Sequence, residues 1–260
     1  MLTAGQKMKN KMRKWLEIGR EQLCSLLFPP RCPVCDEILE PEEIDYGIHP
    51  ACECKLYPVL GAVCMHCGRP FGDINPKEFC YDCIQKGYVI RSDITQAKSL
   101  YRYKGAIKTS MYRLKYSNKR EYASYFAKEA VDRYGDWLRR MGVEVIVPVP
   151  MYPVKKRKRG YNQAESFARE ISKRTGLPVD TKLVHRVVDT APQKELDAKE
   201  RKNNLKNAFQ SGGFIVQYRC VLVVDDIYTT GSTAEAVAHE LIKKGAHRVY
   251  LLTVCIGGDV

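Results

Sequence analysis

The chain has 260 residues, 45% of them hydrophobic and 28% charged, with a formal net charge of +13. No apolar run approaches the roughly 18 residues of a membrane span, and the N-terminus lacks the apolar segment of a secretory signal, so we expect a cytoplasmic protein without a transmembrane segment. The charge is uneven, because residues 32–83 carry three Lys or Arg against ten acids whereas residues 84–260 carry 33 against 18. This positive excess favours partners with phosphate groups, such as nucleic acid, polyphosphate or anionic lipid.

Residues 1–30 predict a basic amphipathic helix. Met8, Met12 and Trp15 begin an apolar stripe among lysines and arginines, and the prolines of "FPP" end it. Two interpretations are open. We favour packing against its own domain or against a partner protein, and the alternative is contact with the inner face of an anionic membrane through Trp15 and the lysines.

The next segment, residues 31–88, predicts a double zinc-ribbon module. Six of the eleven cysteines form C-x2-C pairs, a spacing that in a reducing compartment indicates metal ligands rather than disulfides. Two such knuckles present four soft ligands to one Zn2+. The predicted ligand sets are Cys32, Cys35, His49 and Cys52 in the first unit, and Cys64, Cys67, Cys80 and Cys83 in the second. A histidine breaks the repeat in the first unit, where Cys54 is a spare candidate, so the choice between one zinc and two stays open.

The role expected of this module is structural. Zinc supplies folding free energy to a segment with too few apolar residues for a core. The module's negative charge balance argues against nucleic-acid binding, so we expect a scaffold or a protein-docking module.

From residue 89 to residue 260 the pattern predicts an α/β domain. Near-continuous apolar strands that alternate with amphipathic helices indicate a parallel sheet covered by helices on both faces. Strands are expected at "ITQAKSLYRY", "VEVIVPVP", "RCVLVVDD" and "HRVYLLTVCI", and helices at 106–116, 121–141, 162–176 and 232–245. The polar stretch 186–213 is too long for a simple connection and predicts a hairpin or flap.

Two adjacent acids end one of the apolar strands. Asp225 and Asp226 are costly to bury side by side without a cation or a polyhydroxylated ligand, and they are placed to accept hydrogen bonds from the vicinal hydroxyls of a sugar, directly or through Mg2+. Hydroxyl groups and backbone amides at the start of the following helix form a pocket suited to one phosphate. The residues of that turn are Thr229, Thr230, Gly231, Ser232 and Thr233. The combination predicts a site for a ribose 5-phosphate, and a structural cation is the alternative.

The stretch "VVDDIYTTGST" resembles the phosphoribosyl pyrophosphate (PRPP) motif of type I phosphoribosyltransferases. Further stretches are similar to the ComF-type competence protein family (ComFC), in order along nearly the whole chain. They are "FPPRCPVC", "YRYKGAIKTSMYRLKY", "VPVPMYPVKKRKRGYNQAESFARE" and "PQKELDAKERKNNLKNAF". The resemblance implies an N-terminal zinc ribbon joined to a type I phosphoribosyltransferase-like α/β domain.

Carried over to this chain, the resemblance implies that Asp225 and Asp226 hold the ribose hydroxyls of PRPP and that Thr229 to Thr233 hold its 5-phosphate. The loop after "VPVP" would hold the pyrophosphate, with Arg159 as the main side chain. An ordinary solvated basic loop is the alternative for "KKRKRG". In the hypoxanthine-type members an aspartate, the proposed general base, stands where this chain has Thr229, which lowers the expectation of purine salvage and leaves turnover open.

Residues 98–120 hold eight Lys or Arg and no acid, with tyrosines interleaved among them. Cationic side chains for phosphates and aromatic faces for bases are what sequence-tolerant binding of single-stranded DNA requires. The candidate nucleic-acid residues are Lys104, Lys108, Tyr112, Arg113, Lys115 and Tyr116. The alternative is that the tyrosines face the core and the lysines are merely solvated, a reading that fits Tyr101 and Tyr103 best.

The function expected from residues and resemblance together is that of a competence factor in natural transformation. It would bind single-stranded DNA and PRPP, with Zn2+ in the ribbon and Mg2+ accompanying PRPP, and its partners would include a competence helicase or other DNA-processing proteins. The alternative is an active phosphoribosyltransferase that transfers ribose 5-phosphate from PRPP to an unidentified base or amine.

Overall fold

The computed structural model describes residues 29–71, 78–188, 208–212 and 217–257. The chain divides into two compact units, residues 1–53 and residues 54–260. The helix predicted over residues 1–30 lies almost entirely outside the described residues, as does most of the segment 186–213. The boundary expected at residue 88 follows the motifs, whereas the compact units divide within the double ribbon.

The first unit is small and is organised around its cysteines. A bridge between Arg31 and Ile38 closes the first knuckle, within which the Asp36 amide donates to the Cys32 carbonyl. A 3-10 turn, η1 (Pro41–Glu43), and a short helix, α2 (Pro50–Glu53), follow. Few apolar side chains are buried here, which agrees with the prediction that this segment lacks a core of its own.

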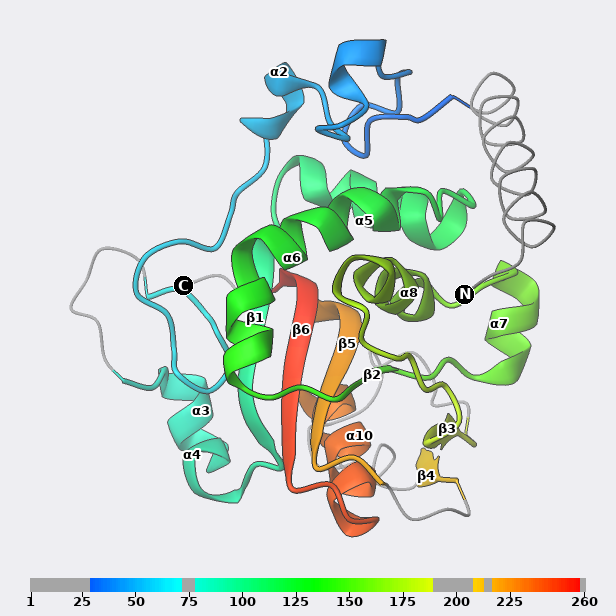
Figure 1. The fold of residues 1–260 in the computed structure, drawn as a ribbon. Coiled ribbons are helices and arrows are strands. Elements are labelled where there is room, and N and C mark those ends of the chain that lie inside the picture. The colour runs from blue at the N-terminus through cyan, green and yellow to red at the C-terminus, as the bar shows by residue number, and fades with distance from the viewer. Residues whose placement is uncertain (1–28, 72–77, 189–207, 213–216, 258–260) are drawn as a thin grey trace, which may run out of the picture. The chain divides into compact units, whose positions relative to one another are not determined.

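The second unit is built on a four-stranded parallel sheet with the order β1-β6-β5-β2 (Figure 1). The strands are β1 (Ile94–Arg102), β2 (Val145–Pro148), β5 (Cys220–Tyr228) and β6 (Arg248–Ile256). The central strands β5 and β6 are buried along nearly their whole length, as expected for parallel strands covered on both faces. The predicted α/β fold with a parallel sheet is confirmed.

Helices cover both faces of this sheet. On one face, Val221 and Val223 of β5 share a buried cluster with Val237 and Leu241 of helix α10 (Ser232–Lys243). On the other, helix α6 (Tyr122–Arg140) places Trp137 edge-on against Tyr250 of β6, with ring centroids 5.4 Å apart. Helix α8 (Gln163–Thr175) packs against α6 and against β2 and β5. It ends at Gly176 with a φ of 76°, as the sequence predicted.

Helix α5 (Ala106–Tyr116) follows β1 and matches the predicted helix in that place. Ile107, Met111 and Leu114 form its buried stripe, so the tyrosines and most basic residues of α5 face away from the core. This arrangement matters for the candidate nucleic-acid residues, nearly all of which belong to α5.

Three short helices among the described residues of the second unit were not predicted. Helices α3 (Tyr81–Gln85) and α4 (Tyr88–Arg91) follow the last cysteine pair. Helix α7 (Pro153–Arg159) occupies the stretch that we expected to be a basic loop. Pro153 stands in its first turn, where the missing amide costs nothing and the fixed φ favours a helical start, and Gly160 ends it with a φ of 84°.

The segment predicted as a hairpin or flap is bounded by a small antiparallel pair, β3 (Val184–Arg186) and β4 (Phe209–Ser211). The pairing of His185 with Gln210 brings the two ends of the segment together. Residues 189–207 between them lie outside the described residues.

Candidate functional site

The two aspartates lie near the carboxyl end of β5, where the strand leads through a tight turn into α10. Gly231 precedes the helix with a φ of +82°, and a Cβ at this position would lie 2.5 Å from the Tyr228 hydroxyl oxygen. Only glycine fits this turn. The hydroxyl groups of Thr230 and Ser232 lie 3.0 Å apart, and Thr229 and Thr230 are exposed. The turn therefore presents hydroxyl groups at the start of a twelve-residue helix, as the sequence predicted.

Asp225 and Asp226 are held close together. The Asp226 amide donates a 2.8 Å hydrogen bond to Oδ1 of Asp225, and Asp226 is 7% exposed. Burial and the neighbouring Asp226 carboxylate raise the pKa of Asp225 to about 8. Two acids in this state favour a ligand that brings a cation or hydroxyl donors.

Asp226 is also paired with a cation from α5. Nζ of Lys115 lies 2.9 Å from Oδ2 of Asp226, and the Gln163 side-chain amide donates to the same oxygen at 3.1 Å. Burial opposes the charge of Lys115, but the Asp226 carboxylate outweighs this effect and raises the pKa of Lys115. Lys115, predicted for nucleic acid, thus contacts a residue predicted for PRPP.

Arg159 ends α7 and reaches the same group of side chains. Its guanidinium donates to Oε1 of Gln163 at 2.8 Å and lies 5.0 Å from the centre of the Tyr116 ring. A chain of contacts therefore runs from Tyr116 through Arg159 and Gln163 to Asp226. The sequence did not indicate Gln163, although its position one residue after the N-cap of α8 orients it toward the carboxyl ends of the strands.

The remaining candidate nucleic-acid residues show different degrees of exposure. Tyr112 and Tyr116 are 61% and 64% exposed, and their ring centroids lie 5.0 Å apart. Lys108 is exposed near the Tyr103 ring, whereas Lys104 lies over the Tyr57 ring.

Tyr101 is buried and its hydroxyl lies 3.0 Å from that of Tyr125, as the alternative interpretation expected for Tyr101. The structure therefore separates an exposed tyrosine pair on α5 from the buried tyrosine of β1.

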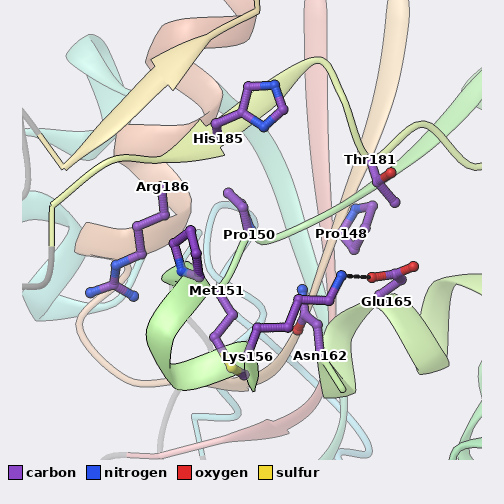
Figure 2. Close-up of a pocket in the computed structure, with 10 residues that line it drawn as sticks. Pro148, Pro150, Met151, Lys156, Asn162, Glu165, Thr181, His185 and Arg186 are labelled. Atoms are coloured by element: carbon purple, nitrogen blue, oxygen red, sulfur yellow. Dashed lines mark hydrogen bonds and ion pairs between the residues drawn. The ribbon is translucent and has the colours of Figure 1, made fainter. Parts of the chain in front are cut away.

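A cavity of about 210 Å³ lies beside the end of β2 (Figure 2). Lys156 of α7 and Glu165 of α8 line it and form a 2.9 Å ion pair. Burial opposes the charge of Glu165, but hydrogen bonds from Lys156 and Arg169 lower its pKa. His185 and Arg186 line the side of the cavity formed by β3. Seven of its ten lining residues lie in the stretch "VPVPMYPVKKRKRGYNQAESFARE", whereas Thr181, His185 and Arg186 come from further along the chain and were not indicated by the sequence.

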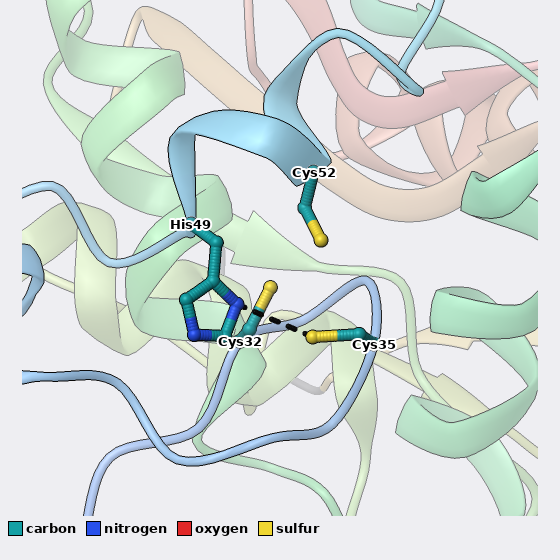
Figure 3. Close-up of side chains that lie close together, drawn as sticks. All are labelled: Cys32, Cys35, His49 and Cys52. Carbon is teal, nitrogen blue, oxygen red and sulfur yellow. Dashed lines mark hydrogen bonds between the residues drawn. The ribbon is translucent and has the colours of Figure 1, made fainter.

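The first predicted zinc set is brought together in the structure, and its side chains point to a common centre (Figure 3). Nδ1 of His49 lies 3.2 Å from Sγ of Cys35, while Nε2 faces the Ile38 carbonyl at 3.1 Å. A histidine ligand oriented by a backbone carbonyl is typical of zinc sites. Cys54, the spare candidate, is exposed and outside this cluster. These residues fit Zn2+.

The second predicted set forms a buried cluster in which the ligand atoms lie within 4.8 Å of one another. Sγ of Cys67 and Sγ of Cys80 are 3.6 Å apart, close to the roughly 3.8 Å edge of a tetrahedron with 2.3 Å zinc–sulfur bonds. A hydrogen bond with Cys64 is the main cause that raises the pKa of Cys67 to about 12. Four thiols this close cannot all ionise without a cation, so this cluster also fits Zn2+.

The second cluster is attached to the sheet and to residues 225–233, which hold the two aspartates and the following turn and are called the acid loop from here on. The Ala97 amide of β1 donates to the His66 carbonyl within the knuckle, and a Cβ on Gly68 would lie 2.6 Å from the Ala97 carbonyl oxygen. Beyond the last cysteine, Nζ of Lys86 and the hydroxyl of Tyr88 lie 3.3 and 3.4 Å from the Thr230 carbonyl oxygen. The second ribbon therefore contacts the predicted phosphate turn.

A helix suited to crossing a bilayer is absent from the part of the chain that the structure describes.

Comparison with known protein families agrees with the two cysteine clusters. Residues 23–84 match the double zinc ribbon domain family. The chain is 32% identical over 202 residues to the DNA utilization protein YhgH of Salmonella typhi, covering 75% of this chain and 84% of that protein. It is 26% identical over 219 residues to the competence protein ComFC of Bacillus subtilis, covering 80% and 82%. Among solved structures, a purine phosphoribosyltransferase from Pyrococcus horikoshii aligns over 50% of this chain and 72% of that chain, at 19% identity and a TM-score of 0.31.

Proposed function

Because this chain belongs to the family of ComF-type competence proteins and YhgH DNA utilization proteins, we propose that it acts in natural transformation by binding single-stranded DNA and PRPP. The double zinc ribbon is the structural part of this protein, and the α/β domain carries both binding surfaces. The observation that carries the proposal is the position of the acid loop at the carboxyl end of β5, beside an exposed pair of tyrosines on basic helix α5.

The acid loop supports PRPP binding through the match between its groups and those of a ribose 5-phosphate. Asp225 and Asp226 offer carboxylate oxygens for the two ribose hydroxyls or for a bridging Mg2+. The turn from Thr229 to Thr233 offers hydroxyls and helix-terminal amides for the phosphate. Arg159, which donates to the Gln163 side chain that contacts Asp226, provides a cation for the pyrophosphate, the role that the sequence resemblance implies for it.

Helix α5 supports binding of single-stranded DNA. Tyr112 and Tyr116 lie one turn apart on its exposed side and present two adjacent rings. Lys108 lies one turn before Tyr112 and is exposed. Rings that stack on bases, next to cations that contact phosphates, bind a strand without requiring a sequence.

The DNA part of the proposal is tested by fluorescence anisotropy with a labelled oligothymidine. Replacing Tyr112 or Tyr116 by Ala removes one stacking ring, which is expected to weaken binding by about 1–3 kcal/mol each. Tyr81→Ala is the matched control, because Tyr81 is 75% exposed but belongs to the second ribbon. Equal effects of all three substitutions, or no effect of the first two, would contradict the proposed surface.

Charge reversal provides an independent test. Lys108→Glu is expected to weaken DNA binding and to reduce the slope of log K against log salt by about 0.7 or more, the contribution of one phosphate contact on a single strand. Lys243→Glu is the control, since Lys243 is equally cationic and exposed but lies at the far end of α10. An unchanged salt slope for Lys108→Glu would count against the assignment.

The PRPP part is tested by titration calorimetry in Mg2+. Replacing both Asp225 and Asp226 by Asn is expected to abolish PRPP binding, because amides bind neither the cation nor two sugar hydroxyls as well as carboxylates do. Asp132→Asn, at an exposed position of α6, is expected to bind as the unchanged chain does. Pyrophosphate release measured with a panel of bases and amines distinguishes a PRPP-binding protein from an active transferase.

A further inference from the structure

Helix α5 contains one basic residue that does not share the exposed side with its neighbours. Lys115 directs its ammonium group inward to Asp226, at 2.9 Å, and its side chain is 22% exposed. The Asp226 side chain is 9% exposed, so this pair is largely shielded from water. One end of the contact belongs to the candidate DNA surface and the other to the candidate PRPP loop.

The residue next to Lys115 is held by the same network. One face of the Tyr116 ring is covered by the guanidinium of Arg159, 5.0 Å from the ring centre. Arg159 in turn donates to Gln163, and Gln163 donates to the same Oδ2 of Asp226 that Lys115 contacts. Two neighbouring residues of α5 are therefore tied to one carboxylate oxygen.

A ligand that binds Oδ2 of Asp226 cannot leave these contacts as they are. Mg2+ or a ribose hydroxyl needs the oxygen lone pairs that Lys115 and Gln163 occupy, and a divalent cation at this oxygen also repels an ammonium group 2.9 Å away. A pyrophosphate group attracts the Arg159 guanidinium through bidentate hydrogen bonds, which draws it away from the Tyr116 ring. Binding of both parts of the ligand thus releases a cation and uncovers an aromatic face on α5.

We propose that binding of PRPP with Mg2+ at the acid loop releases Lys115 to the surface of α5 and uncovers the face of the Tyr116 ring that Arg159 covers, so that PRPP and single-stranded DNA strengthen each other's binding. This inference rests on the proposed function and specifies its regulation. Lys115 then acts as an internal counter-ion for Asp226 in the ligand-free chain and as a phosphate contact in the chain bound to PRPP. Because linkage is reciprocal, DNA also increases the affinity for PRPP by the same factor.

The test measures the affinity of a labelled oligothymidine by anisotropy, in Mg2+ alone and in Mg2+ with saturating PRPP. For the unchanged chain, PRPP is expected to tighten DNA binding about fivefold, the lower end of typical coupling between two sites. Free pyrophosphate at the same concentration is the control for ionic strength and for competition at phosphate contacts.

Lys115→Met keeps the length of the side chain and removes its charge. It is expected to reduce the effect of PRPP on DNA binding to less than about twofold, and to bind PRPP itself more tightly than the unchanged chain, since no ion pair has to break. Lys115→Gln is the second variant, because its amide can still donate to Asp226 and keeps the site folded if the Met variant unfolds.

Lys108→Met is the matched control on the same helix. It removes an exposed cation that does not contact the acid loop, so it is expected to weaken DNA binding while the fivefold effect of PRPP remains.

Three results overturn the inference. The first is equal DNA affinity with and without PRPP, the second is weaker DNA binding with PRPP, and the third is full coupling in both Lys115 variants. Failure of the unchanged chain to bind either ligand overturns the proposed function, and the inference with it. Binding of both ligands without coupling overturns the inference alone.

Discussion

Asp225→Asn is expected to stabilise the α/β domain while removing a group that the site needs. In the folded chain, burial and the Asp226 carboxylate raise the pKa of Asp225 from its ordinary value of 3.8 to about 8. A carboxyl group whose pKa is higher in the folded chain than in the unfolded chain binds more protons in the folded state. It therefore weakens the folded state at every pH above the unfolded pKa.

The magnitude follows from these two pKa values. The penalty begins near pH 4, grows by about 1.4 kcal/mol for each pH unit, and stops growing above pH 8. This amounts to about 4 kcal/mol at pH 7, and because the Asp225 side chain is partly exposed, solvent screening reduces it to about 2 kcal/mol. An asparagine at this position does not titrate, and its Oδ1 still accepts the hydrogen bond from the Asp226 amide.

The assay is urea unfolding followed by Trp137 fluorescence, with zinc kept saturating. Trp137 is buried on α6 against the sheet, and Trp15→Phe provides a background without the other tryptophan. We expect Asp225→Asn to raise the free energy of unfolding by about 3 kcal/mol at pH 8, where the penalty is largest, and by little at pH 4.5. Asp226→Asn is expected to lower it at pH 8, because Lys115 loses its partner.

Two results would refute this reasoning. One is a gain for Asp225→Asn of the same size at both pH values, which would assign the effect to packing rather than to ionisation. The other is the absence of any gain at pH 8. Asp132→Asn, which removes an exposed carboxylate on α6, is the control and is expected to stay within about 0.5 kcal/mol at both pH values.

Two further predictions concern the second ribbon. Cys80→Ser is expected to remove one zinc per chain, measured by atomic absorption, and to lower the unfolding free energy seen by Trp137 fluorescence by about 2 kcal/mol or more. Cys35→Ser is expected to remove the other zinc without changing the unfolding free energy seen by Trp137, because the first cluster belongs to the other compact unit. Equal losses of unfolding free energy in the two variants would contradict this division. Gly68→Ala is expected to cost about 3 kcal/mol, since a Cβ there meets the Ala97 carbonyl in addition to a left-handed backbone. Gly176→Ala has the same type of φ but open space around it, so a loss of about 1 kcal/mol is expected, and similar losses for the two glycines would rule out the contact.

The parts of the fold that could be predicted are those in which local pattern and global structure agree. The apolar run before Asp225 became the buried strand β5, and the C-x2-C spacing brought each set of four ligands to one point. In both cases a few neighbouring residues specify the geometry, either through burial on both faces of a sheet or through the short turn of a knuckle. The repeat extends to the backbone, because Asp36 and Gly68 occupy the same place after their cysteines and share a φ near 71°.

The part of the site that could not be predicted depends on contacts between distant segments. The sequence grouped Lys115 with the other basic residues of its helix, because a cluster of charges does not reveal which way each side chain points. The helical period does contain a signal: Lys115 lies one turn after the buried Met111 and next to the buried Leu114, at the border of the apolar stripe. That position indicates a side chain turned inward, but its partner, Asp226, lies more than a hundred residues away and only the sheet brings them together.

The second ribbon shows why the division by motif differs from the division by packing. Its cysteines alone suggest an independent module, yet the residues around them form hydrogen bonds with the strands and helices of the α/β domain. The His66 carbonyl extends the hydrogen bonds of β1, and Ser92, which lies 2.8 Å from Nε2 of His66, donates to Glu235 of α10. A metal that fixes His66 by ligating its neighbours Cys64 and Cys67 thereby fixes the start of α10, which directly follows the predicted phosphate turn. Since Lys86 and Tyr88 reach the Thr230 carbonyl from the same ribbon, zinc in the second cluster supports the shape of the acid loop as well as the stability of the sheet.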